Sequence, residues 1–265
     1  MTTAQVSSRP FAFGRVVENT LHVLAKNPWV YLGLSAIFVG APSLIGVVVL
    51  LRLEQAGVIP ASDGGATVAQ FWFSGIVGLF GYPAFAGACA TAVAQLDGQR
   101  IAFGQALSTG LRHWLRLVAV GLLIGLGVCL GIVLLVVPGV ILAVAWFVAV
   151  PASVIERLAP RAALGRSRAL TRGRRWPIFG LLLLLALAGF LIGGLIGLFS
   201  GVIWGIVHVA GSGLGLPRYA AIAPFVTVLI QTVVYPLHAA CIACVYAELR
   251  GRAGAGAETV AATFA

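Results

Sequence analysis

Long stretches of the chain contain no aspartate, glutamate, lysine or arginine: residues 27–51, 64–96, 117–155, 176–217 and 219–247. A helix needs roughly 20 apolar residues to cross the hydrocarbon core of a bilayer, and each stretch is longer than that. Charged residues make up only 9% of the chain, against about 25% in a soluble domain. The sequence therefore predicts an all-α, polytopic membrane protein, and it excludes a soluble enzyme, a nucleic-acid-binding domain and a disordered chain.

Two of these stretches are longer than one span requires. Residues 117–155 are interrupted by Val137-Pro138-Gly139. Because proline cannot continue a helix, we expect two spans joined by a tight turn at that point. Residues 176–217 end in a glycine-rich segment and are expected to form one long or tilted helix. The sequence thus predicts six transmembrane helices, at about 28–52, 68–95, 116–137, 140–157, 177–206 and 220–247.

The basic residues lie almost entirely on one side of this arrangement. Fifteen of the 17 lysines and arginines fall in the N-terminal tail, the second and fourth loops, or the C-terminal tail. Only Arg52 and Arg218 fall on the other side. Since basic residues collect in cytoplasmic loops, both termini are expected to be cytoplasmic. We interpret the net charge of +10 as topology charge that faces the anionic leaflet, and expect no nucleic-acid partner.

One membrane domain is expected to occupy residues 11–250. The predicted loops are too short to hold an extramembrane domain. Segments 1–10 and 251–265 are rich in small residues, and we expect both to be disordered tails.

Three segments that precede the odd-numbered spans resemble one another: Phe13-Gly14-Arg15, Phe103-Gly104-Gln105 and Leu164-Gly165-Arg166. Apolar residues recur at helical spacing after the first two, and the third is more basic. Acidic residues, Asp97 and Glu248, follow the second and sixth spans. We interpret this as a threefold repeat, in which a cytoplasmic interfacial helix precedes a two-span hairpin. The alternative is that the cytoplasmic ends of hairpins resemble one another without a repeat.

The fifth predicted span carries a glycine at every fourth position: Gly189, Gly193, Gly197, Gly201 and Gly205. Gly-x-x-x-Gly lets helix backbones approach closely in lipid. The third span offers glycines that can pack against this stripe: Gly121, Gly125, Gly127 and Gly131. We interpret the stripe as a helix-packing face, within one chain or between the subunits of a homo-oligomer. A pore lining is a further alternative.

A dense group of arginines, with Trp176 at the membrane boundary, precedes the fifth span: Arg166, Arg168, Arg172, Arg174 and Arg175. Guanidinium groups bind phosphate oxygens in a bidentate manner. The group is therefore a candidate contact for anionic lipid headgroups. The alternative is that its charge serves topology alone.

The sequence carries no residue pattern that is typical of an active site. No predicted span holds a carboxylate at mid-depth, and the common protease, hydrolase and phosphate-loop motifs are absent. Cys241-x-x-Cys244 lies near His238, but no second cysteine pair or acidic ligand accompanies it. Buried cysteines in such positions behave as small apolar residues. We therefore expect no catalysis, no metal and no cofactor.

A series of short motifs runs from the fourth predicted span into the arginine group: Val137-Pro138-Gly139-Val140, Val150-Pro151, Glu156-Arg157, Ala162-Ala163-Leu164, Arg166-Ser167 and Leu170-Thr171-Arg172-Gly173. This series resembles bacterial six-helix membrane proteins of the glycerophosphoryl diester phosphodiesterase membrane-domain type, most clearly over residues 97–182. In that family the catalytic phosphodiesterase is a separate soluble domain, which this chain does not contain. The resemblance implies a bacterial inner-membrane location and no agreed activity, and the name of the enzyme does not carry over to this chain.

These features favour a non-enzymatic scaffold or lipid-interacting module. Its expected partners are membrane lipids, with anionic headgroups among them, and a second copy of the chain or another membrane protein. The alternative from a different class is a transporter of a small solute or lipid. It predicts a mid-membrane cavity lined by Tyr82, Gln231, Tyr235 and His238.

Overall fold

The computed structural model describes residues 13–58, 65–99, 101–173, 175–214 and 222–264. Every regular element within these residues is a helix, which confirms the predicted all-α class. The elements are α1 (Phe13–Lys26), α2 (Pro28–Ser35), the π-helix η1 (Ala36–Gly40), α3 (Ala41–Gln55), α4 (Gly65–Leu96), α5 (Phe103–Leu134), α6 (Val136–Ala145), α7 (Ala149–Ile155), α8 (Pro160–Thr171), α9 (Arg175–Leu214) and α11 (Ile222–Phe264).

Within the described chain, five helical segments are long and apolar enough to cross a membrane: Pro28–Leu53, Gly78–Leu96, Phe103–Leu134, Val136–Ile155 and Phe225–Gly251. A bend of 108° separates α8 from the first part of α9, and these two helices make a sixth candidate if they form one broken span. The structure thus holds five to six helices with the length and apolar character of membrane spans.

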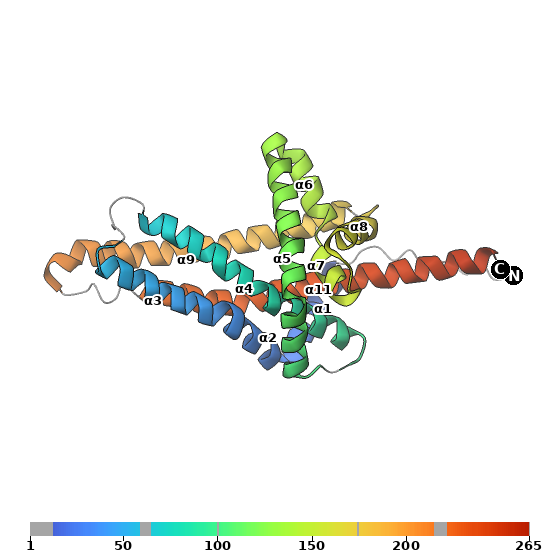
Figure 1. Cartoon of the computed structure of the whole chain (residues 1–265), viewed down its shortest axis with the longest axis horizontal. Coiled ribbons are helices and arrows are strands. Elements are labelled where there is room, and N and C mark those ends of the chain that lie inside the picture. The colour runs from blue at the N-terminus through green and yellow to red at the C-terminus, as the bar shows by residue number, and fades with distance from the viewer. Residues whose placement is uncertain (1–12, 59–64, 100, 174, 215–221, 265) are drawn as a thin grey trace.

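The long helices follow two directions (Figure 1). Helices α3, α4, α9 and α11 run along the long axis of the molecule, whereas α5 and α6 stand across it. Side chains of α5 such as Leu126 and Leu130 are 60% exposed, as suits a surface that contacts lipid or another protein. Because α5 and α6 do not run alongside the other helices, the predicted arrangement of three hairpins is not confirmed.

The turn between α5 and α6 lies at Leu135, and not at Pro138-Gly139 as predicted. Leu135 adopts an extended conformation (φ −166°, ψ 136°), and Pro138 falls in the first turn of α6. A proline there disrupts no helical hydrogen bond, because the first N–H groups of a helix have no intrahelical partner. Gly139 instead permits α6 to pack closely against α5. A Cβ added at Gly131 of α5 would stand only 2.7 Å from the Cα of Gly139.

The three segments predicted as interfacial helices differ from one another. The first forms α1, which ends before Asn27, and the third forms α8, which is followed by Gly173 at φ +80°. The second is not separate, because α5 continues without interruption from Phe103 to Leu134. No proline stands between those two residues to end a helix. The prediction of a separate helix in the second position is therefore wrong.

Helix α11 extends to Phe264, through the segment for which the composition favoured a disordered tail. Alanine is the best helix former, and residues 251–264 are rich in it. Glycines in that segment did not prevent the helix from continuing.

Neighbouring helices compensate for prolines inside α4 and α11. Pro83 has no N–H to donate to Leu79 O, four residues before it in α4. Trp114 Nε1 of α5 donates to that oxygen instead, at 3.0 Å. Pro236 likewise leaves Thr232 O of α11 without a helical donor. Ser35 Oγ of α2 donates to that oxygen at 2.7 Å. An unpaired carbonyl in lipid costs several kcal/mol. These two bonds therefore join α5 to α4 and α2 to α11.

The buried core lies where α1, α2, α4, α7 and α11 meet, and small side chains dominate it. From α1 it takes Val16 and Val23, while Val17 and Leu21 of that helix are exposed. The cysteines of Cys241-x-x-Cys244 belong to this core as well. Because small residues let helix axes approach closely, the charged ends of these helices are brought together.

Candidate functional site

Charged residues of the described chain gather at one end of the helices, which we call the basic end. It consists of α1, the end of α4, the start of α5, α7, α8 and the part of α11 around residue 248. Ion pairs of the described residues link these elements: Arg166–Glu156, Arg250–Asp97 and Arg15–Glu248. Segments from the N-terminal region, the second and fourth predicted loops and the last helix therefore lie together in the fold.

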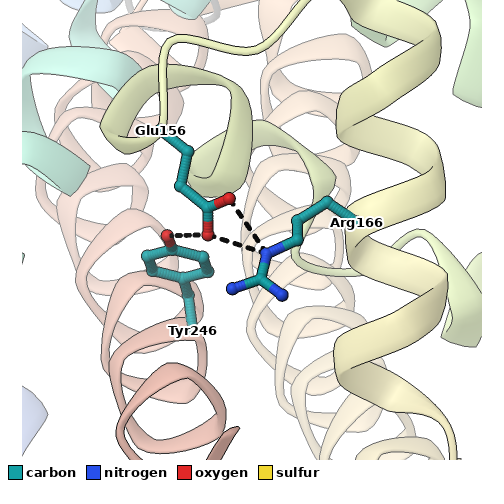
Figure 2. A network of polar contacts seen from close by, with 3 residues as sticks. All are labelled: Glu156, Arg166 and Tyr246. Carbon is teal, nitrogen blue, oxygen red and sulfur yellow. Dashed lines mark hydrogen bonds and ion pairs between the residues drawn. The ribbon is translucent and has the colours of Figure 1, made fainter. Parts of the chain in front are cut away.

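Glu156, which directly follows α7, binds two side chains at once (Figure 2). Its carboxylate accepts hydrogen bonds from Arg166 Nε at 2.9 and 3.0 Å and from the Tyr246 hydroxyl at 2.8 Å. Tyr246 is fully buried in α11, and Arg166 is half-buried in α8. Charge-assisted hydrogen bonds are about twice as strong as neutral ones. Glu156 therefore joins α7, α8 and α11.

Arg250 connects this group to the end of α4. Its guanidinium lies 5.9 Å from the centroid of the Tyr246 ring. Its Nη2 also donates to the two carboxylate oxygens of Asp97 at 3.0 and 3.3 Å. A continuous set of polar contacts thus runs from α8 through α7 and α11 to α4.

Two of the ion pairs occupy equivalent places in the predicted repeat. Arg15 and Arg166 are each the third residue of one of the related segments. Arg166 binds Glu156, the acidic residue that follows the preceding helix. Arg15 binds Glu248 of the last helix, at 3.5 Å, so that the end of the chain meets its beginning. We call these two places the closed junctions.

The third equivalent place is different. There the related segment carries Gln105, whose Oε1 accepts a hydrogen bond from Ala102 N at 3.2 Å. The acidic residue before this segment, Asp97, binds Arg250 instead. We call the region between the end of α4 and the start of α5 the open junction. Among the described residues, an uncharged side chain at position 105 thus coincides with the absence of an arginine–carboxylate pair between these two segments.

A cavity of about 410 Å³ lies at the open junction. Apolar side chains of α4 and α7, such as Val93 and Val154, form part of its wall. Arg112 and His113 of α5, with Arg157 after α7, supply the basic side chains. The sequence singled out neither arginine, because residues that lie 45 positions apart share no local pattern.

Helix α8 is fixed to the fold by one face. The hydroxyls of Ser167 and Thr171 donate to Ala145 O at 2.9 and 3.4 Å. That carbonyl has lost its helical partner because α6 ends at Ala145. Ala163 and Leu170 are buried on the same face. The opposite face is consequently held toward the outside.

The arginines predicted to bind lipid do not share one role. Arg168, Arg172 and Arg175 are exposed, as is Trp176 at 83%. Arg168 also lies over the Trp146 ring, at 6.0 Å from its centroid. Arg166 differs, because its guanidinium is committed to Glu156. The remaining member, Arg174, lies outside the described residues.

At Gly189, the one position of the predicted glycine stripe of α9 whose surroundings the structure describes, no other helix packs against the glycine. At Gly189 the space that a Cβ would occupy is open. The side-chain surroundings of Gly193, Gly197, Gly201 and Gly205 lie outside what the structure describes. Exposed apolar residues surround the stripe, with Phe190 75% exposed.

Glycines of α5 permit close contacts, but with α4 and α6 and not with α9. A Cβ added at Gly110 would stand 2.3 Å from Pro83 O of α4. Gly121 faces the hydroxyl of Tyr82, and Gly127 faces the ring of Trp146. The predicted pairing of the third and fifth spans through glycines is therefore wrong for these positions. At Gly125 the corresponding space is open.

Of the residues predicted to line a transport cavity, Tyr82 and Tyr235 lie near each other, whereas Gln231 and His238 have other surroundings. Tyr82 lines a shallow groove of about 310 Å³ together with residues of α5. The Tyr235 hydroxyl faces Gly81, and His238 Nδ1 lies 3.3 Å from a carbonyl of its own helix. Gln231 is exposed. These positions give the transport alternative no support.

Comparisons with protein-family models, with curated proteins and with solved structures gave no match. The resemblance of residues 97–182 to the phosphodiesterase membrane-domain family therefore stays a prediction.

Proposed function

We propose that this protein is a non-enzymatic, multi-pass membrane protein that binds anionic lipid headgroups through α8 and the start of α9. It acts as a scaffold or lipid-interacting module in a bacterial inner membrane, with both termini in the cytoplasm. One observation carries this proposal. Ser167 and Thr171 fix one face of α8 to the fold, while Arg168 is exposed on that helix and Arg172 and Arg175 are exposed beyond it.

The energetics agree with this assignment. A basic residue near an anionic leaflet contributes about 1 kcal/mol to membrane binding. Three exposed arginines thus contribute about 3 kcal/mol. Trp176 stands beside them, and tryptophan favours the boundary between headgroups and hydrocarbon. Arg166 adds little, because its charge is already paired with Glu156.

The test replaces Arg168, Arg172 and Arg175 with glutamine in the full chain. The variant is reconstituted in vesicles of phosphatidylcholine with a minor share of phosphatidylglycerol and then extracted in neutral detergent. We expect the phosphatidylglycerol that co-purifies to fall at least tenfold in occupancy, because three charge-assisted contacts are lost. The lipid is quantified by native mass spectrometry.

Two controls make this result specific. Lysine at the same three positions keeps the charge and the topology, and we expect it to retain most of the lipid. Arg166→Gln removes one charge from the same helix, and we expect it to leave the bound lipid nearly unchanged. Equal lipid in the glutamine variant and the unmodified protein, with topology verified by cysteine accessibility, would overturn the proposal.

A further inference from the structure

The cavity at the open junction is built from separate elements that meet at the basic end. The end of α4, the start of α5 and the residue after α7 all contribute to it. At about 410 Å³ it falls within the range of small-molecule sites. It also exceeds the size of a bare phosphate ion, so it has room for an organic group beside the apolar side chains of its wall.

The charge of the cavity is positive. Arg112, Arg157 and His113 line it together with one carboxylate, that of Asp97. Both oxygens of Asp97 accept hydrogen bonds from Arg250, which balances the charge of the carboxylate. Among the residues that the structure describes, neither Arg112 nor Arg157 forms an ion pair. Two exposed arginines of the described chain therefore line the cavity without an ion-pair partner among the described carboxylates.

Arg157 adopts a backbone conformation that is unusual for its residue type. Its φ is +52°, and it is the one non-glycine residue of the described chain with a positive φ. Glycine occupies the other such positions, Gly57, Gly98 and Gly173. The conformation is held from outside, since Arg116 Nη1 donates to Arg157 O at 3.2 Å. Residues in sparsely populated conformations cluster at ligand sites, and here an arginine is kept where glycine would fit with less strain.

We propose that the cavity of the open junction is a binding site for a phosphate ester, held by the guanidinium groups of Arg112 and Arg157. The fork of a guanidinium matches the oxygens of phosphate. His113 adds a third polar side chain to the wall, and its Nδ1 lies 2.9 Å from Thr109 O. The phosphate belongs either to a lipid headgroup or to a water-soluble ester. This site shares no residue with the lipid contact proposed for α8 and does not depend on it.

The test measures ligand binding to the full-length protein in neutral detergent by isothermal titration calorimetry. Glycerol 3-phosphate is the water-soluble probe, dihexanoyl phosphatidic acid is the lipid probe, and glycerol is the phosphate-free control. We expect saturable binding of at least one phosphate probe and none of glycerol. Binding of the lipid probe alone, with its loss in the variant Arg112→Gln with Arg157→Gln, assigns the site to a headgroup. Binding of both probes assigns it to phosphate esters in general. Failure of both probes to bind would overturn the proposal.

A matched pair of double variants locates the binding. Arg112→Gln with Arg157→Gln should weaken the affinity at least tenfold. Arg52→Gln with Arg161→Gln removes the same charge from two exposed arginines outside both proposed sites and should change the affinity for glycerol 3-phosphate by less than twofold. Equal losses in the two double variants would show that only the net charge matters, which would overturn the cavity site while leaving the α8 proposal untouched.

A single substitution separates ligand binding from folding. Arg157→Gly suits the positive φ, so we expect an unchanged or higher unfolding temperature. The same variant removes one of the two guanidinium groups, so we expect the phosphate probe to bind several-fold more weakly. A stable Arg157→Gly variant with unchanged affinity would contradict the role of Arg157.

Discussion

The closed and open junctions lie at corresponding places of the predicted repeat, and the third residue of the related segment is an arginine at the closed junctions and a glutamine at the open one. At each closed junction an arginine of a related segment binds a carboxylate from another helix end, as Arg166 binds Glu156. At the open junction Gln105 stands in the arginine's place, and a cavity of about 410 Å³ lies beside it. The comparison indicates that an ion pair seals a junction, and that an uncharged residue at the same place leaves room for a ligand.

The two closed junctions are themselves unequal. Glu156 has a buried partner in Tyr246 as well as Arg166, whereas the Arg15–Glu248 pair measures 3.5 Å and the Arg15 side chain is 40% exposed. Exposed ion pairs contribute little because water and salt screen them. We therefore expect stability to rest mainly on the Glu156 junction.

The largest effect should come from removing Glu156. Glu156→Ala leaves the half-buried Arg166 and the buried Tyr246 hydroxyl without their acceptor. We expect a loss of about 2–3 kcal/mol, because the hydrogen bond from the buried Tyr246 hydroxyl contributes about 1.5–3 kcal/mol and the partly exposed Arg166 pair adds little more. Thermal unfolding in detergent measures it. Asp97→Ala, at the open junction, removes an exposed carboxylate and should cost about 0.5 kcal/mol. Similar losses in both variants would break the comparison between the junctions.

A smaller effect is expected at the attachment of α8. Ser167 is fully buried and donates to Ala145 O, so Ser167→Ala leaves a buried carbonyl with a weaker partner. We expect a loss of about 1–2 kcal/mol in the free energy of unfolding. Ser108→Ala makes the same change at the open junction, where the hydroxyl is exposed, and should stay within about 0.5 kcal/mol. A greater loss for Ser108→Ala would show that the open junction is the more rigid region.

The smallest effect should come from Arg15. Arg15→Gln is expected to cost about 0.5 kcal/mol at low salt, and less as salt is raised, because exposed pairs are screened. Unfolding temperatures at low and high sodium chloride measure this dependence. Arg166→Gln serves as the matched variant and should cost more at both salt concentrations. A salt-independent loss at Arg15 that equals the loss at Arg166 would show that the two closed junctions are alike.

Local patterns in the sequence predicted the helices well but placed several features incorrectly, and two of these errors concern where a helix begins. The break expected at Pro138 lies at Leu135, since a proline in the first turn of a helix fits without cost. The interfacial helix expected before the third span is part of α5, because no proline separates it from that span. Both errors concern how a residue sits relative to the start of a helix, which composition alone does not specify.

The candidate site was only partly visible in the sequence. The arginine group before the fifth span was found from charge density, and three of its members are exposed. Its first member, Arg166, is paired with a carboxylate ten residues earlier and, through Glu156, with a tyrosine of the last helix. The sequence did not indicate that Arg112 of α5 and Arg157 after α7 share a site, because they lie 45 residues apart and meet only in the folded chain.

The sequence by itself determined the helical class, the approximate number of spans and the grouping of basic residues. Each of these depends on the total hydrophobicity or charge of a contiguous segment, because the transfer of a helix to lipid depends on the apolar surface of that segment. Only the tertiary structure decided which arginine meets which carboxylate. An ion pair needs a nitrogen and an oxygen within about 4 Å of each other, and the partners Asp97 and Arg250 lie 153 residues apart in the sequence. Helix packing therefore set which two junctions close and which one stays open.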